Sequence, residues 1–268
     1  MLPLYKKKLF LFDMDGTLWL GDRLFDGTME LLSRIRNMGA RYLFVTNNSS
    51  TSAAGYVKKL ARLGIASVRC DFLTSTYATS LYIKKNCPDK TFFAVGTPDF
   101  ISEMREYGIS VTEKLTDGTD GVILSNDTTI NFYKLECACA LLRRGVTYIA
   151  TNPDWVCPAE GGYLPDCGSF SFLLEKATGR APVFIGKPNP DMLTLAIARA
   201  GVTPEETVMV GDRMYTDIAS GVRAGIDTVF VLSGEGTAQD VEASDFKPTY
   251  IMKDIKELSD RLGEKATE

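Results

Sequence analysis

The stretch Phe12-Asp13-Met14-Asp15-Gly16-Thr17 directly follows a short apolar run, residues 9–12, that predicts a buried β-strand. Residues i and i+2 of an extended segment face the same side, so Asp13 and Asp15 can present two carboxylates to one point. Open α/β sheets bind ligands at this end of a strand, and Gly16 permits a sharp turn there. Neighbouring carboxylates repel each other unless a cation or a proton separates them. The pair therefore predicts a hard metal ion such as Mg²⁺, a raised pKa, or both, with a solvated turn as the alternative.

Similar apolar runs recur along the chain, each followed by a loop, an amphipathic stretch and a glycine. This pattern is typical of β-α units, whose parallel strands are covered by helices on both faces. The predicted strands are 9–12, 42–45, 91–95, 122–124, 147–150, 183–185, 208–210 and 228–231, and the predicted helix-ending glycines are Gly39, Gly64, Gly108, Gly145, Gly201 and Gly225. The predicted fold class is α/β, with a Rossmann-like parallel-sheet core.

Composition and charge exclude several classes of function. The chain of 268 residues has 30 Lys and Arg against 34 Asp and Glu, a balance that offers no basic surface for a nucleic-acid backbone. Histidine is absent from the sequence, which excludes Ser-His-Asp triads and imidazole zinc sites. The cysteines show no C-x-x-C spacing, no secretory signal precedes them, and no apolar run is long enough to span a membrane. We expect a soluble, cytoplasmic protein with neither nucleic-acid nor membrane partners.

Three further polar clusters stand at predicted strand ends. Thr46-Asn47-Asn48-Ser49-Ser50 precedes a helix whose free N–H groups favour an anion, with simple capping by Ser49 or Ser50 as the alternative. In Gly186-Lys187-Pro188-Asn189-Pro190, the lysine could neutralise a phosphate or a carboxylate cluster. After the strand 208–210, Asp212 and Asp217 could complete an oxygen-rich metal shell, unless Asp217 is only a first-turn acid of the next helix.

The middle of the chain differs from both ends and predicts an inserted lobe. It contains three predicted strands and a long polar loop from Asn152 to Gly168, which we expect to face the substrate. The predicted domains are a core of residues 1–79 and 180–268 and an inserted α/β cap domain of residues 80–179. The segment 39–47 resembles the segment 145–152, and the simpler interpretation is that two β-α units converge on similar strand ends.

Together these motifs resemble the haloacid dehalogenase (HAD) superfamily, and within it the phosphatases with a large type II cap, the NagD-like or nitrophenylphosphatase-like group. The resemblance covers nearly the whole chain and rests on Asp13-Met-Asp-Gly-Thr17, Thr46-Asn-Asn-Ser-Ser50, Thr151-Asn-Pro-Asp154, Gly186-Lys-Pro-Asn-Pro190 and Gly211-Asp212 to Asp217. It implies that Asp13 is the nucleophile and Asp15 the general acid and base. It also implies that phosphate contacts Thr46, Asn47 and Lys187. Mg²⁺ would be held by Asp13, by Asp15 through its backbone carbonyl, and by Asp212, with Asp217 in support.

The predicted cap departs from the family pattern at one place. Members of this group often carry a Pro-Gly-small-Gly run, whereas this chain has Pro165-Asp166-Cys167-Gly168. The extra carboxylate of Asp166 could contact a sugar hydroxyl or an amine. We predict that Asn152, Asp154, Trp155 and Asp166 set the substrate specificity.

The resemblance implies a magnesium-dependent phosphomonoesterase that hydrolyses small phosphorylated metabolites, sugar phosphates or nucleotide monophosphates, through an aspartyl-phosphate. A phosphomutase of the same superfamily is one alternative. A phospho-acceptor signalling module is another, although receiver domains are shorter and lack an inserted lobe. The oligomeric state stays open, with a homodimer among the options. Cys137 and Arg143 match the C-x5-R spacing of cysteine phosphatases, but the residues between them predict an amphipathic helix.

Overall fold

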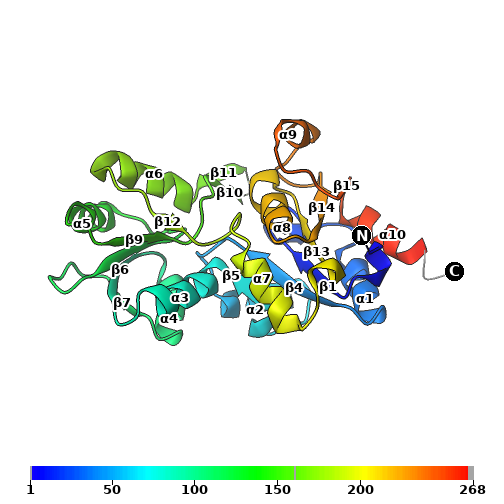
Figure 1. Cartoon of the computed structure of the whole chain (residues 1–268), viewed down its shortest axis with the longest axis horizontal. Coiled ribbons are helices and arrows are strands. Elements are labelled where there is room, and N and C mark those ends of the chain that lie inside the picture. The colour runs from blue at the N-terminus through cyan, green and yellow to red at the C-terminus, as the bar shows by residue number, and fades with distance from the viewer. Residues whose placement is uncertain (1, 160, 265–268) are drawn as a thin grey trace.

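The computed structural model describes residues 2–159 and 161–264, which form two adjacent lobes (Figure 1). The first lobe, the core, is built on a six-stranded parallel sheet in the order β15-β14-β13-β1-β4-β5. These strands are β1 (Leu9–Phe12), β4 (Arg41–Thr46), β5 (Phe72–Thr74), β13 (Thr207–Gly211), β14 (Asp227–Val231) and β15 (Tyr250–Met252). Every residue of β1 and β13 is buried, as expected of central strands covered on both faces.

Helices cover both faces of the core sheet, because successive side chains of each strand point to opposite faces. The helices of this lobe are α1 (Thr28–Asn37), α2 (Ala53–Arg62), α7 (Asp191–Ala200), α8 (Ala219–Arg223), α9 (Ala238–Ala243) and α10 (Ile255–Glu264). On one face, Phe10, Phe12 and Phe44 pack with residues of α1, α2 and α10. On the other, Leu9 and Leu11 pack with residues of α7.

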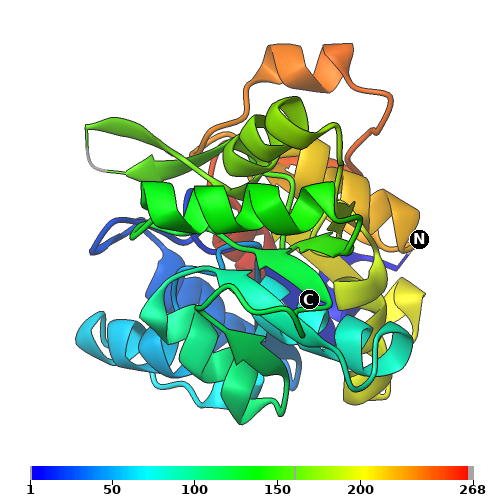
Figure 2. The same cartoon turned by 90° about the vertical axis from the view of Figure 1, so that its left-hand side faces the viewer.

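The second lobe is built on a five-stranded parallel sheet in the order β12-β9-β8-β6-β7. Its elements are α3 (Ser75–Asn86), β6 (Thr91–Val95), α4 (Pro98–Glu106), β7 (Ser110–Thr112), β8 (Gly121–Leu124), α5 (Phe132–Arg143), β9 (Thr147–Ala150), α6 (Cys167–Thr178) and β12 (Val183–Phe184). Figure 2 shows α5 and α6 lying side by side on this lobe. They pack on one face of the sheet, and α3 and α4 pack on the other.

Two antiparallel hairpins project from the sheets. The first, β2 (Trp19–Leu20) with β3 (Arg23–Leu24), follows the turn at Gly16. The second pairs β10 (Val156–Ala159) with β11 (Gly162–Pro165). The prediction of a loop from Asn152 to Gly168 is therefore wrong over these residues. Proline is mostly confined to edge strands and to the first residue of a strand, so Pro158 and Pro165 argued against strands here.

The strand pairing bears on the predicted domain boundaries. The boundary at residue 80 falls inside α3, and the boundary at residue 179 separates β12 from β9, its hydrogen-bonded partner. We therefore propose an insertion that runs from within α3 to the end of β12. The apolar run 183–185 did predict a strand, but it lies in the second sheet, because its register follows Ile149 and Ala150.

Other local differences are small. The helix after Thr46 begins only at Ala53, where Ser52, rather than Ser49 or Ser50, accepts a hydrogen bond from Gly55 N. The chain after Asp212 forms a π-helical turn, Met214–Ile218, before α8. Cys137 is buried on α5, as the amphipathic pattern predicts. None of the described helices has the length and apolar character needed to cross a lipid bilayer.

Candidate active site

The polar clusters predicted at strand ends meet where the carboxyl edges of the two sheets face each other. They line one small pocket together with two residues of the β10–β11 hairpin. Its lining residues are Asp13, Asp15, Thr46, Asn47, Asn48, Asp154, Cys157, Pro158, Asp166, Lys187, Arg213 and Thr216. The volume available is about 30 Å³, which holds little more than one water molecule. The second lobe therefore covers the strand ends of the core and leaves little space at Asp13.

Lys187 is the positive centre of this pocket. Its Nζ donates hydrogen bonds to Asp13 Oδ1 at 2.6 Å, to Asp217 Oδ1 at 2.6 Å and to the carbonyl oxygen of Val45 at 2.9 Å. The side chain of Lys187 is only 2% exposed. Burial alone lowers the pKa of Lys187, but the two carboxylates outweigh this effect and raise it. The lysine is therefore a permanently charged ammonium whose three donors are all used.

Asp13 follows the last residue of β1 and lies between this lysine and two other acids. Burial raises the pKa of Asp13 well above its ordinary value, Lys187 opposes this, and Asp217 and Asp212 add to it. Asp212 follows β13 and accepts hydrogen bonds from Thr17 Oγ1 at 2.9 Å and from Glu235 N at 2.8 Å. Burial, reinforced by Asp217, raises the pKa of Asp212 to about 6.

The carboxylates of Asp13, Asp212 and Asp217 form the group that could hold a metal ion. One oxygen from each lies within 4.8 Å of the others. Oxygen donors of this kind suit a hard divalent cation. Asp217 joins the cluster directly, whereas sequence reasoning gave it a supporting place. The Asp15 carboxylate does not belong to this group, and the role of the Asp15 backbone carbonyl as a metal ligand stays a prediction.

The Asp15 side chain turns instead toward the start of the β2–β3 hairpin. Its Oδ1 accepts a hydrogen bond from Trp19 Nε1 at 2.7 Å and lies 3.4 Å from Lys59 Nζ. Lys59 also lies over the Trp19 ring, 5.1 Å from its centroid. Among the described residues, every hydrogen bond to this carboxylate falls on Oδ1. The side chain is 22% exposed and lines the pocket, and Oδ2 accepts no hydrogen bond from the described residues.

The two similar strand ends noted in the sequence lie in contact. Ser49 Oγ is 2.8 Å from Thr151 Oγ1, and Asn152 Nδ2 donates to the carbonyl oxygen of Asn47 at 2.8 Å. Asn47 in turn holds Lys187 in place, because its Oδ1 accepts from Lys187 N and its Nδ2 donates to Lys187 O. These bonds fix β4 and β9 end to end and position Lys187 between the two lobes.

Two acids of the second lobe reach the pocket. Asp154 Oδ2 lies 3.2 Å from Arg213 Nη1, and burial raises the pKa of Asp154 to about 6 although Arg213 opposes this. Asp166 caps α6, with Oδ1 accepting from Cys167 N and Oδ2 from Asn126 Nδ2. Burial and then the nearby Asp154 raise the pKa of Asp166 to about 7.

The other predicted cap residues do not line this pocket. Asn152 is fully buried, and its Oδ1 accepts from Asp154 N. Trp155 is 53% exposed and packs edge-on against Phe172. Sequence reasoning missed Arg213, which directly follows Asp212 and pairs with Asp154 and Glu235. A basic residue beside the strand-end acid was the available signal. Trp19 and Lys59 carried no such signal.

Comparisons with known proteins agree with this arrangement. A model described as haloacid dehalogenase-like hydrolase matches residues 10–110, and a HAD-hydrolase-like model matches residues 184–258. The chain is 34% identical over 250 residues to an acid sugar phosphatase of Staphylococcus aureus, covering 93% of this chain and 96% of that protein.

Solved structures are equally similar. A 4-nitrophenylphosphatase from Thermotoga maritima has a TM-score of 0.90 and 39% identity, covering 96% of this chain and 98% of that one. A glycerol phosphate phosphatase from Mycobacterium tuberculosis, solved with magnesium, has a TM-score of 0.86 and 31% identity, covering 96% of this chain and 76% of that one. NagD from E. coli K-12 has a TM-score of 0.83 and 30% identity, covering 94% and 98%. The chain therefore belongs to the haloacid dehalogenase-like hydrolase family, among its NagD-like phosphatases.

Proposed function

We propose that this protein is a magnesium-dependent phosphomonoesterase that acts on small sugar phosphates through an aspartyl-phosphate on Asp13. The observation that carries the proposal is the contact of Asp13 with Lys187 at 2.6 Å, inside a cluster of three carboxylates beneath the second lobe. The similarity to acid sugar phosphatases and to a 4-nitrophenylphosphatase supports this substrate class.

The charge of the cluster supports a divalent cation. Asp13, Asp212 and Asp217 carry three negative charges when ionised, and Lys187 supplies one positive charge to this cluster. The two remaining negative charges are those that one divalent ion neutralises. We propose Mg²⁺, which is also bound in the structure of the glycerol phosphate phosphatase. When bound, it supplies Lewis-acid stabilisation of the phosphoryl oxygens.

Asp13 is placed to act as the nucleophile. Its side chain is 13% exposed at the pocket, so one carboxylate oxygen can reach the phosphorus of a bound ester while Lys187 holds Oδ1. In the first step a bond forms between Asp13 and phosphorus and the bond from phosphorus to the ester oxygen breaks. In the second step water attacks the phosphorus and releases Asp13. Lys187 stays fixed throughout, because its three donors are committed.

Asp15 is placed to move the proton. Its Oδ1 is held by Trp19 and Lys59, so Oδ2 can donate a proton to the departing ester oxygen and later accept one from the attacking water. Thr46 through its hydroxyl and Asn47 through its backbone N–H would bind the phosphoryl oxygens, since both line the pocket and the Asn47 side chain is committed to Lys187 and Asp154.

The departing alcohol has a cavity of its own. A space of about 310 Å³ adjoins the catalytic pocket at Pro158 and is lined by both hairpins, with Tyr163 on one side and Leu20 and Phe25 on the other. This volume suits a small sugar or polyol. We propose that the β10–β11 hairpin and Asp166, rather than Asn152 or Trp155, set the choice of alcohol.

The proposal is tested by incubating the purified protein and Mg²⁺ with a panel of sugar phosphates, nucleotide monophosphates and glycerol phosphate. We expect release of inorganic phosphate, largest with one of the sugar phosphates. Isomerised substrate without free phosphate would instead identify a phosphomutase. No release from any ester by folded protein would contradict a phosphatase.

The Asp13→Asn variant is the matched control, with an expected loss of at least about 10³-fold in kcat. Its fold should be unaffected, because the substitution removes one charge from a crowded acidic cluster. A thermal unfolding midpoint no lower than that of the unmodified, metal-free protein verifies this.

A further inference from the structure

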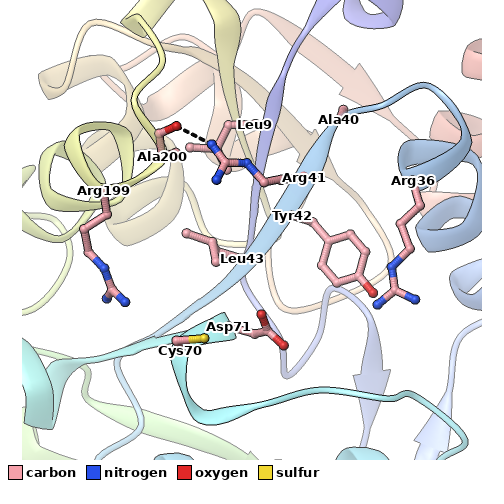
Figure 3. Close-up of a pocket in the computed structure, with 10 residues that line it drawn as sticks. All are labelled: Leu9, Arg36, Ala40, Arg41, Tyr42, Leu43, Cys70, Asp71, Arg199 and Ala200. Carbon is pink, nitrogen blue, oxygen red and sulfur yellow. Dashed lines mark hydrogen bonds between the residues drawn. The ribbon is translucent and has the colours of Figure 1, made fainter.

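A second cavity, of about 350 Å³, opens at the opposite edge of the core sheet, where the strands begin (Figure 3). It exists because β5 starts only at Phe72, opposite Phe44, so the first three residues of β4 have no strand beside them on that side. The ends of α1 and α7 and the turn before β5 enclose this gap. The catalytic residues lie at the other end of β4, so this cavity is not part of the pocket at Asp13.

Three arginines from three separate elements line the cavity. Arg36 comes from the end of α1, Arg41 from the start of β4 and Arg199 from the end of α7. Arg41 donates to the carbonyl oxygen of Ala200, as Figure 3 shows. Arg36 lies over the Tyr42 ring and Arg199 over the Tyr77 ring. Within residues 2–159 and 161–264, none of these three guanidiniums forms an ion pair with a carboxylate.

The local charge balance favours an anion. One carboxylate lines the cavity, that of Asp71, which accepts a hydrogen bond from Val68 N. The C-terminal ends of α1 and α7 contribute about half a negative charge each. Together with three guanidiniums and one carboxylate, they give the cavity a net charge of about +1. Helix dipoles account for a preference for arginine in the last turns of α1 and α7. They do not account for Arg41, which lies on a strand, or for the presence of three arginines around one cavity, where Figure 3 shows their guanidiniums on separate sides.

We propose that this cavity binds the phosphoryl group of a small phosphorylated metabolite. Guanidinium forks match phosphate oxygens in geometry and charge, and the volume lies within the range of small-molecule sites. β4 separates Arg41 from Thr46 by five residue steps, roughly 17 Å at strand spacing. A ligand in this cavity and an ester at Asp13 therefore bind at the same time.

Cys70 provides a site-specific reporter. It lines this cavity and is exposed, whereas Cys157 lines the catalytic pocket. Alkylation by neutral iodoacetamide, followed at each cysteine by peptide mass spectrometry, distinguishes the two sites. Inorganic phosphate and ADP are the probes, at ionic strength matched with KCl. At a probe concentration of twice its Kd, Cys70 should react about threefold more slowly, by mass action.

Arg36→Gln and Arg199→Gln should each abolish most of the protection of Cys70. Arg143→Gln is the matched control, since it makes the same charge change on the exposed end of α5. Protection by ADP but not by phosphate supports the proposal and shows that the organic part also contacts the cavity. The proposal fails if neither probe slows Cys70, if only Cys157 is protected, or if both cavity variants keep full protection.

Discussion

Lys187 shows how one residue sets the chemistry of the site. Removing two carboxylates from water is costly, and their partner must be close and correctly hydrogen-bonded to offset that cost. Lys187 meets both conditions for Asp13 and Asp217, while Asn47 holds its backbone from both sides. Asp212 has no such ammonium and is held by neutral donors. The site is therefore arranged so that its last acid stays available to a cation.

Asp15→Asn tests the proton transfer at a single atom. The asparagine can still accept from Trp19 through Oδ1 but has no proton to give to a departing alcohol. We expect kcat on a sugar phosphate to fall by about 10² to 10⁴-fold. On 4-nitrophenyl phosphate, whose leaving group departs without a proton, the loss should be much smaller. Equal losses on the two esters would show that Asp15 is not the acid.

Asp166→Asn tests the cost of a buried carboxylate. Burial raises the pKa of Asp166 to about 7, so the folded protein binds the proton on Asp166 more tightly than the unfolded chain does. The stability that the protonated side chain contributes is complete below the ordinary pKa of an aspartate and is lost as the pH rises through about 7. Asparagine caps a helix as well as aspartate, and Asn126 Oδ1, which has no hydrogen-bond partner, can accept from the new amide after a flip of Asn126.

We therefore expect the Asp166→Asn variant to match the unmodified protein most closely at about pH 3.5, below the ordinary pKa of 3.8, and to exceed it at about pH 8 by a few kcal/mol, an order-of-magnitude figure. Urea unfolding midpoints at the two pH values measure the difference. A variant that is less stable at pH 8 would show that the carboxylate is needed in its ionised form.

The turn at Gly16 is the element that brings β1 to the acid cluster. Gly16 has φ +93°, and a Cβ there would lie 2.5 Å from Asp212 Oδ2. Gly39 also has a positive φ, +73°, but open space surrounds it. Both glycine-to-alanine changes carry the left-handed penalty of about 1 kcal/mol, so the difference between them isolates the contact with Asp212.

Gly16→Ala should therefore weaken Mg²⁺ binding and activity, whereas Gly39→Ala should lower only the unfolding midpoint. Titration of activity against Mg²⁺ for both variants gives the comparison. If the two variants bind Mg²⁺ equally well, the packing of Gly16 against Asp212 does not matter to the metal site.

Elements differed in how well the sequence could predict them. Long apolar runs such as those of β1 and β9 are buried on both faces, and the six predicted helix-ending glycines all adopt positive φ. The edge strand β7, Ser110–Thr112, is short and partly exposed, so no continuous apolar run marks it.

The directions of side chains were harder to predict than the elements that carry them. The spacing of Asp13 and Asp15 predicts a shared face, but the chain leaves strand geometry after Phe12, and Trp19 and Lys59 take the second carboxylate elsewhere.

The whole molecule has its active site between two parallel sheets whose carboxyl edges face each other. The core supplies Asp13, Thr46 and Asp212, while β12 of the second sheet leads into Lys187. The lobes are joined across the pocket by buried bonds, including that between Arg213 and Asp154. A site built in this way is complete only when the lobes are together, and little space is then left at Asp13.

We predict that the lobes separate during each turnover, and a crosslink can test this. Asn48 Nδ2, in the core, lies 3.9 Å from Cys157 Sγ in the β10–β11 hairpin, so Asn48→Cys places two thiols across the pocket. We expect the oxidised variant to lose nearly all turnover and to regain it when dithiothreitol reduces the disulfide. The same sample before and after reduction is its own control for the loss of Asn48. Undiminished turnover in fully crosslinked protein would mean that esters reach Asp13 without separation of the hairpin from the core.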